Sequence, residues 1–344
     1  RSTNFNPVAD ASWKNYQSES APNTTGRTED YGVRLSLLDG RLSVGFNRFV
    51  AAANDQARLA NQYRAPLNSI LNRLRTNYRD FGDSHFILMD TPAFPIVNLV
   101  DNVSDTWSYR ATGYELNVTF NPSRNWRVAL TGSENSNVLG THLTSLGRYL
   151  NSAAPFEGLA TWRKFASELR KVEAGQRSAS FDLNPADPAA RSKAGADALL
   201  IEQQTATAER SYQDELAIEG ITTSRNGRYA FNGLITHVFP KEGRLKGWSV
   251  GGNFRWRSAS TIGYLRTPNT AGVPNGVIDP ARPLKGADNW ELGAMLSHER
   301  RIFRNVTLRT QLNVENPLDW SKPRLVSSDY ETNGVLGTAN AIVP

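Results

Sequence analysis

Apolar and polar side chains alternate on both sides of a turn in the stretch 113–134, and this pattern constrains the fold more than any other feature of the sequence. The even-numbered positions of Tyr114–Phe120 and of Trp126–Leu130 are all aromatic or aliphatic, and the segment NPSRN (121–125) separates them. Alternate side chains of a strand point to opposite faces, so this period of two predicts a β-hairpin with one apolar and one polar face. Such a hairpin fits a soluble antiparallel sheet with one solvated face, or a transmembrane barrel with a polar interior.

The same alternation recurs along the chain. It flanks the turn at Asp39–Gly40, continues through Trp248–Trp256, and returns in two arms at 290–296 and 306–314. Tyr229–Phe239 is also expected to be a strand, but its facing is ambiguous because His237 lies within its better apolar set. The connections between these arms are alternately short and long, so we expect the long ones to gather at one end of the sheet. Outer-membrane barrels have this arrangement, whereas loops of such length are uncommon in compact soluble domains. The pattern therefore favours a barrel over a β-sandwich.

The phase of the alternation predicts which side chains face lipid. It is the same around each short turn, so one set of residues should share the outer side of a single continuous sheet. Aromatic residues at strand ends, such as Trp248 and Trp256, are typical of the two interfacial belts of a barrel. The residues expected on the outer side are Leu116, Val118, Trp126, Val128, Val250, Phe254, Leu308 and Leu312. Those expected on the inner side are Glu115, Arg127, Arg255, Arg257, Arg309 and Glu315.

Two long inserts, at 51–105 and 135–210, interrupt the strands, and the helical spacing of their apolar residues predicts helices in both. Pro66 divides the first pattern and predicts two short helices there. Strands are expected to resume near Tyr212, and 260–287 is expected to be a loop because it is rich in Gly and Pro. Loops on a rigid scaffold commonly hold binding residues, so we interpret both inserts as extracellular caps that determine ligand selectivity. The candidate ligand-binding residues are Tyr149, Trp162, Arg163 and Phe165, and packing within the cap is the alternative role for each of the three aromatic residues.

Composition argues against several other classes of protein. The net charge of +6 is spread over 344 residues without a basic tract, so no nucleic-acid partner is expected. There is no cysteine, and the four histidines are far apart, so we expect neither a disulfide framework nor a metal site. No apolar run approaches the roughly 18–20 residues of a membrane-spanning helix. No catalytic constellation is present, and the sequence predicts neither an enzyme nor a cofactor.

Three segments resemble the late barrel strands of TonB-dependent outer-membrane receptors. They are GYELNVTFNPSRNWRVAL (113–130), GRLKGWSVGGNFRWRSASTIGY (243–264) and LRTQLNVENPLDWSKP (308–323). The stretch LNVENPLD is similar to the penultimate-strand motif of that family, usually of the type Asn-Leu-Phe-Asp, with Pro317 and Leu318 in place of Leu-Phe. The resemblance covers most of the strand segments and does not cover the helical inserts.

The resemblance implies that 1–344 is an incomplete antiparallel transmembrane β-barrel, about nine strands from the C-terminal part of a larger one, whose first and last strands do not pair with each other. It implies a receptor in the outer membrane of a Gram-negative-type bacterium that imports a scarce nutrient such as a ferric siderophore, cobalamin or a carbohydrate. The partners would be outer-membrane lipid, the nutrient, and the TonB complex through an N-terminal region that this sequence lacks. A passive porin and an all-β surface binding module are the alternatives, and a plug domain upstream in the full gene would favour the receptor.

Overall fold

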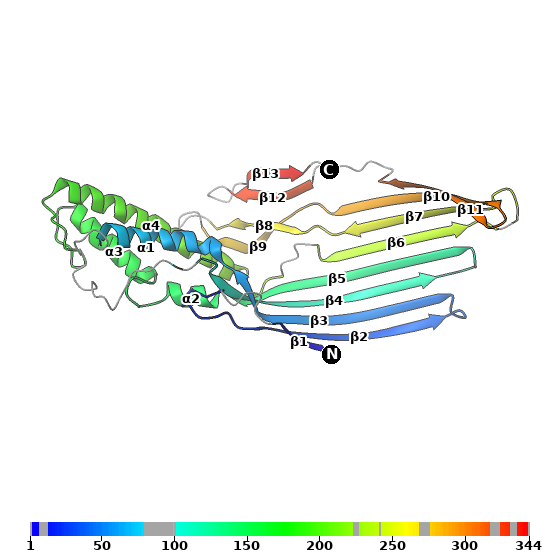
Figure 1. Ribbon diagram of the computed structural model, residues 1–344, viewed down its shortest axis with the longest axis horizontal. Coiled ribbons are helices and arrows are strands. Elements are labelled where there is room, and N and C mark those ends of the chain that lie inside the picture. The colour runs from blue at the N-terminus through cyan, green and yellow to red at the C-terminus, as the bar shows by residue number, and fades with distance from the viewer. Residues whose placement is uncertain are drawn as a thin grey trace.

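The computed structural model of the chain is one long antiparallel sheet with helices gathered at one end (Figure 1). The structure describes residues 2–6, 13–78, 99, 101–222, 227–240, 242–267, 276–316, 324–330 and 336–342. The strands of the main sheet are β1 (Ser2–Asn6), β2 (Thr24–Leu37), β3 (Leu42–Leu59), β4 (Ser104–Phe120), β5 (Trp126–His142), β6 (Tyr229–Val238), β7 (Trp248–Arg257), β10 (Asn289–Phe303) and β11 (Val306–Glu315). They pair in chain order as a nine-stranded sheet.

Short and long connections lie at opposite ends of this sheet, as the sequence predicts. The short turns join β2 to β3, β4 to β5, β6 to β7 and β10 to β11, at the end away from the helices (Figure 1). In the first turn Leu38, Asp39 and Gly40 have φ values of 54°, 52° and 80°, which matches the Asp-Gly signal for a tight hairpin. The parts of the long connections that the structure describes lie at the helical end (Figure 1).

The sheet is open in the part of the chain that the structure describes. There β1 pairs only with β2, and β11 pairs only with β10. An open antiparallel sheet of about nine strands with helical insertions is the predicted fold class, and this prediction is confirmed. Two small sheets accompany it, formed by β8 (Thr261–Arg266) with β9 (Ile278–Lys285) and by β12 (Arg324–Tyr330) with β13 (Leu336–Ile342).

The helices form a cap at the end of the long connections. Helix α1 (Asn61–Tyr78) lies between β3 and β4, and the helices α2 (Thr144–Leu150), α3 (Leu159–Glu173) and α4 (Pro188–Ala217) lie between β5 and β6. We call these four helices the helical cap. The buried hydrophobic cluster of the molecule belongs almost entirely to the cap and its junction with the strands, as Leu67, Ile70, Trp162, Leu169 and Ile201 illustrate. Among the described residues, no helix is both long and apolar enough to cross a membrane.

The first predicted insert, 51–105, is shorter in the structure. Strand β3 continues to Leu59 and β4 begins at Ser104. The sequence pattern does not reveal that β3 continues, because Ala51–Ala53 place small side chains on both faces of the strand and hide the alternation. Pro66 does not divide α1, so the prediction of two short helices there is wrong. Burial of the apolar side of α1 in the cap outweighs the local cost of the proline.

The second predicted insert, 135–210, also has different bounds in the structure. Strand β5 reaches His142, and α4 runs through Tyr212, where strands were expected to resume. Helix α4 begins at a well-formed N-cap: the Asp187 carboxylate accepts a hydrogen bond of 2.9 Å from the Ala189 amide, and a proline occupies the first turn. The expected loop 260–287 contains the β8–β9 hairpin instead. Its prolines are tolerated because β9 pairs only with β8 among the described residues.

Candidate functional site: an apolar sheet face and a helical cap

One face of the sheet carries large apolar side chains that remain uncovered by the rest of the described chain. Directly paired residues of neighbouring strands share a face, and the ladder Val44, Val118 and Leu130 shows this across three strands. The same phase continues from β2 to β11, and all eight residues predicted for the outer side lie on it. We call this the apolar face. Its side chains are substantially exposed, for example Val33 at 56% and Leu312 at 60%.

Aromatic side chains mark both ends of the apolar face. Near the short turns, the rings of Trp126 and His237 lie 4.3 Å apart, and those of Trp248 and His298 lie 4.7 Å apart. Toward the cap, Trp256 contacts Phe231 and Trp290, with ring centroids at 5.6 and 5.9 Å. On β7 the two tryptophans are eight residues apart, which at a strand tilt near 40° corresponds to roughly 20 Å along a membrane normal. Two aromatic rows at about this spacing are typical of the two interfaces of a bilayer.

The opposite face of the sheet is polar. Register places on it all six residues predicted for the inner side, and we call it the polar face. Cross-strand pairs hold its side chains together: Arg255 lies 3.8 Å from Glu291, Asn232 donates to Thr131 at 3.1 Å, and the hydroxyls of Ser249 and Ser297 are 2.6 Å apart. The two faces therefore differ in chemistry along the whole width of the sheet.

Three of the four predicted ligand-binding residues lie in the core of the cap. Trp162, Phe165 and Tyr149 are 0%, 1% and 3% exposed, and the Trp162 indole donates to the carbonyl of Phe156 at 2.8 Å. The rings of Tyr149 and Trp162 pack on each other, and the ring of Phe165 packs on Phe181. This burial fits packing within the cap, which is the alternative role of these large aromatic side chains, and direct contact with a ligand stays a prediction. Arg163 alone of the four is exposed at the surface of the cap.

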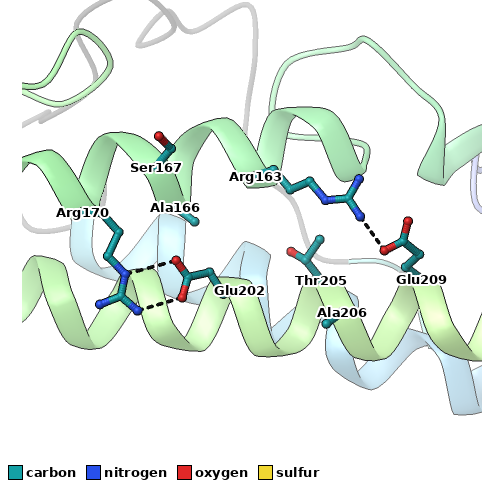
Figure 2. A pocket seen from close by; sticks show the side chains of 8 residues that line it. All are labelled: Arg163, Ala166, Ser167, Arg170, Glu202, Thr205, Ala206 and Glu209. Carbon is teal, nitrogen blue, oxygen red and sulfur yellow. Dashed lines mark hydrogen bonds and ion pairs between the residues drawn. The ribbon is translucent and has the colours of Figure 1, made fainter. Parts of the chain in front are cut away.

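Arg163 lines a groove of about 470 Å³ between α3 and α4. Arg170 binds Glu202 through two hydrogen bonds, at 3.1 Å from Nε and 2.7 Å from Nη2, and Arg163 pairs with Glu209 (Figure 2). We call this the charged groove. The hydrogen bonds that the Arg170 guanidinium donates to the carboxylates of Glu202 and Glu173 raise the pKa of Arg170, so the guanidinium stays charged. The remaining residues that line the groove are Ala166, Ser167, Thr205 and Ala206.

Each arginine of the charged groove already faces a carboxylate, so the groove has no net excess of charge. It can accept a polar ligand with both donors and acceptors more readily than a simple anion. The same pairs clamp α3 onto α4. Glu202, Glu209 and Arg170 were not among the predicted site residues. One sequence signal could have identified them. Arg163 and Arg170 are seven residues apart on α3, and Glu202 and Glu209 are seven residues apart on α4. A spacing of seven places both arginines on one face of α3 and both glutamates on one face of α4.

Buried polar contacts fasten the cap to the ends of the strands. The carboxylate of Asp105, on β4, accepts the Leu146 amide at 2.7 Å and so caps α2. His142, at the end of β5, places its Nε2 3.4 Å from Glu215, which also accepts a 2.7 Å hydrogen bond from the Tyr63 hydroxyl. Among the described residues, no group of three His, Cys, Asp or Glu side chains is arranged to hold a metal ion.

Solved structures of bacterial receptors and a transporter resemble this chain. The pyoverdine outer membrane receptor FpvA from Pseudomonas aeruginosa PAO1 is 12% identical with a TM-score of 0.47, over 100% of this chain and 31% of the receptor. The ferric-catecholate import receptor Fiu from K12 E. coli is 13% identical with a TM-score of 0.43, over 99% of this chain and 30% of Fiu. The ferric citrate transporter FecA is 10% identical with a TM-score of 0.40, over 94% of this chain and 30% of FecA. No protein-family model and no curated protein matches the sequence.

The chain spans about 30% of the length of these proteins. The features that bear on its own function are the uncovered apolar face, the polar face behind it, and the cap with its charged groove.

Proposed function

We propose that this chain is part of the β-barrel wall of an outer-membrane receptor for nutrient uptake. The observation that carries this proposal is the apolar face, which is uncovered and bounded by aromatic rows at both ends. In water, a contiguous apolar surface of this extent would promote aggregation. In a bilayer the same surface is solvated by lipid, while the strand ladders satisfy the backbone hydrogen-bonding groups.

The position of the cap supports an orientation. Outer-membrane barrels have short turns on the periplasmic side and long loops on the outside, so the helical cap would lie outside the cell. There it would take part in selecting the ligand, with Arg163 and the charged groove as the exposed polar site. The sequence resemblance supports uptake of a scarce nutrient, such as a ferric siderophore, cobalamin or a carbohydrate. The same resemblance supports energisation by TonB through a region outside this sequence.

An uptake assay tests the proposal. Cells that express the full-length protein carrying this chain would be supplied with iron-loaded siderophores, cobalamin or maltodextrins as sole sources, with and without a functional TonB. A receptor should support uptake of one of these classes only when TonB is present. Uptake that is unchanged without TonB would identify a passive channel and contradict the receptor. Absence of the protein from the outer membrane would contradict the membrane assignment itself.

A matched pair of variants tests the role of the cap. Arg163 and Arg148 both have side chains 54% exposed, and each pairs with a glutamate, but only Arg163 lines the charged groove. We expect Arg163→Gln to raise the ligand concentration needed for half-maximal uptake, and Arg148→Gln to leave it unchanged. Equal effects of the two variants would remove Arg163 from the list of ligand contacts. Deleting the segment from Thr144 to Ala217 should abolish uptake and leave membrane insertion intact, because it spares every strand of the main sheet.

A further inference from the structure

One histidine is buried where the helical cap joins the sheet. His142 ends β5, and its side chain is 0% exposed. It lies ten residues beyond Gly132, which pairs with Phe231 of the cap-side aromatic row, so it is outside the apolar band. Two carboxylates at the C-terminal end of α4 face its ring: Nε2 lies 3.4 Å from Glu215, and Nδ1 lies 3.7 Å from Glu219. We call these three residues the junction cluster.

Oxygen atoms face both ring nitrogens of His142. Besides the two carboxylates, the carbonyl oxygen of Gly140 lies 3.1 Å from Nδ1. A neutral imidazole carries one N–H, so each of its tautomers points a lone pair at an oxygen, whereas the imidazolium donates from both nitrogens. At 3.4 Å the contact of the buried Nε2 with Glu215 is long for a hydrogen bond, so its strength depends on the charge of the ring. The geometry therefore favours the protonated ring.

The same end of α4 joins three of the long connections. Glu215 accepts a 2.7 Å hydrogen bond from the hydroxyl of Tyr63, which lies on α1. Asp214 pairs with Arg266 of β8 and accepts the amide of Ile278, on β9, at 3.0 Å. Helix α1, helix α4 and the β8–β9 hairpin belong to the connections β3–β4, β5–β6 and β7–β10. A change that loosens the end of α4 therefore loosens the contacts among all three connections.

His142 is not the only ionisable side chain at this junction. Burial raises the pKa of two phenols, and two further carboxylates already hold an arginine or three backbone amides. These groups are Tyr63, Tyr212, Asp214 and Asp105. Burial alone would lower the pKa of His142, but Glu215, the Gly140 carbonyl and Glu219 raise it above the ordinary 6.5. Titration near neutral pH therefore belongs to His142.

We propose that a proton on His142 fastens the end of α4 to the sheet, and that the cap loosens when this proton is lost. Since the pKa of His142 is raised in the fold, the stabilisation is complete below about pH 6.5 and disappears as the pH rises through the folded pKa. Deprotonation removes the positive charge that Glu215 and Glu219 face, so the attraction that holds them to β5 is lost. The helical cap would therefore be firmest in mildly acidic surroundings and looser in alkaline ones.

Amide hydrogen exchange of the full-length protein carrying this chain, in detergent micelles between pH 6 and 9, tests the proposal. Measured rates are corrected for the intrinsic increase of exchange with pH. We expect the protection of amides 212–219 to fall by about tenfold or more over this range, as for the loss of a hydrogen bond between charged groups. The protection of the buried part of α3, 162–169, should stay constant. No ligand is added, so the outcome does not depend on the proposed function.

Two histidine variants form a matched pair. Each histidine lies beside a tryptophan: the rings of His142 and Trp107 are 6.4 Å apart, and those of His298 and Trp248 are 4.7 Å apart. His298 lies at the opposite end of the sheet, near the short turns. His142→Gln has no imidazole to protonate, so its amides 212–219 should show at pH 6 the low protection that the wild type shows at pH 9. His298→Gln should keep the pH dependence of the wild type.

Glu219→Gln decides the case in which His142→Gln unfolds the whole cap. This variant keeps the imidazole and removes one of the charges that face it, so the midpoint of the pH dependence should shift to lower pH. Protection of 212–219 that is independent of pH in the wild type would overturn the proposal. The same conclusion would follow from a pH dependence that persists in His142→Gln, or from an unchanged midpoint in Glu219→Gln.

Discussion

An arginine at Ile235 should destabilise this protein in a membrane far more than an arginine one residue away. Ile235 lies on the apolar face of β6, four residues from Phe239 and four from Phe231, so it sits midway between the two aromatic rows. Its side chain is 44% exposed in the described structure, so lipid is its expected neighbour. An arginine on the lipid side of a barrel strand near the bilayer midplane costs about 2–4 kcal/mol.

Leu234 provides the matched control. It is the adjacent residue of the same strand, it is 43% exposed, and it points to the polar face between Ala129 and Asn253. Leu234→Arg removes a similar apolar side chain from a similarly exposed position. We expect Leu234→Arg to lower the free energy of unfolding by less than about 1 kcal/mol, which is close to the usual range for surface substitutions. The difference between the two variants therefore isolates the contribution of the lipid.

The assay is reversible folding of the full-length protein into phospholipid vesicles, followed by tryptophan fluorescence across a urea titration. A cost of 2–4 kcal/mol lowers the folding equilibrium constant by about 30- to 1000-fold for Ile235→Arg. The same ranking should appear in the amount of each variant found in the outer membrane. Equal destabilisation by the two arginines, or a larger effect at Leu234, would refute the assignment of the apolar face to lipid.

Two further substitutions test the helical cap by amide hydrogen exchange in the intact protein. The buried carboxylate of Glu168 accepts hydrogen bonds from Ser178 and Ala179; burial alone would raise its pKa, but Lys171 and these donors lower it below the ordinary 4.5. The carboxylate therefore stabilises the fold fully above pH 4.5, and this stabilisation is lost as the pH falls through the folded pKa. Glu168→Gln should lower the exchange protection of α3 by about 1–2 kcal/mol at pH 7 and by less near pH 4. A difference that does not depend on pH would contradict this. Tyr78→Phe removes a 2.5 Å hydrogen bond to the buried Asp197 and should cost about 1.5–3 kcal/mol of α1 protection, whereas unchanged protection would show that the bond contributes nothing.

The strands and their faces could be predicted from the sequence because alternation reports the direction of each side chain directly. A single period-two pattern placed Leu116, Trp126, Val250 and Leu312 on one face, and the register of the sheet agrees. The pattern also located the short turns, since composition changes sharply at Asp39–Gly40 and at the other turns. Each of these features depends only on neighbours in the chain.

The bounds and contacts of the cap could not be predicted from the sequence, because they depend on residues far apart in the chain. Ala51–Ala53 have the same small side chain on both faces, so nothing local shows that β3 continues through them. The aromatic residues of α3 look alike whether they face a ligand or a core, and only the packing of Phe165 on Phe181 decides. The ion pairs of the charged groove join helices that are dozens of residues apart, and α1 tolerates Pro66 through burial that no local pattern reveals.

The most direct test of the account is a scan of lipid contact along β7. The sequence has no cysteine, so single cysteines can be introduced from Trp248 to Trp256 and spin-labelled in the full-length protein in its membrane. The account predicts a period of two: labels at 250, 252 and 254 should be accessible to dissolved oxygen in lipid, and labels at 249, 251, 253 and 255 should not. Accessibility to lipid on both faces, or on the odd-numbered positions alone, would contradict the claim that this sheet is a membrane wall.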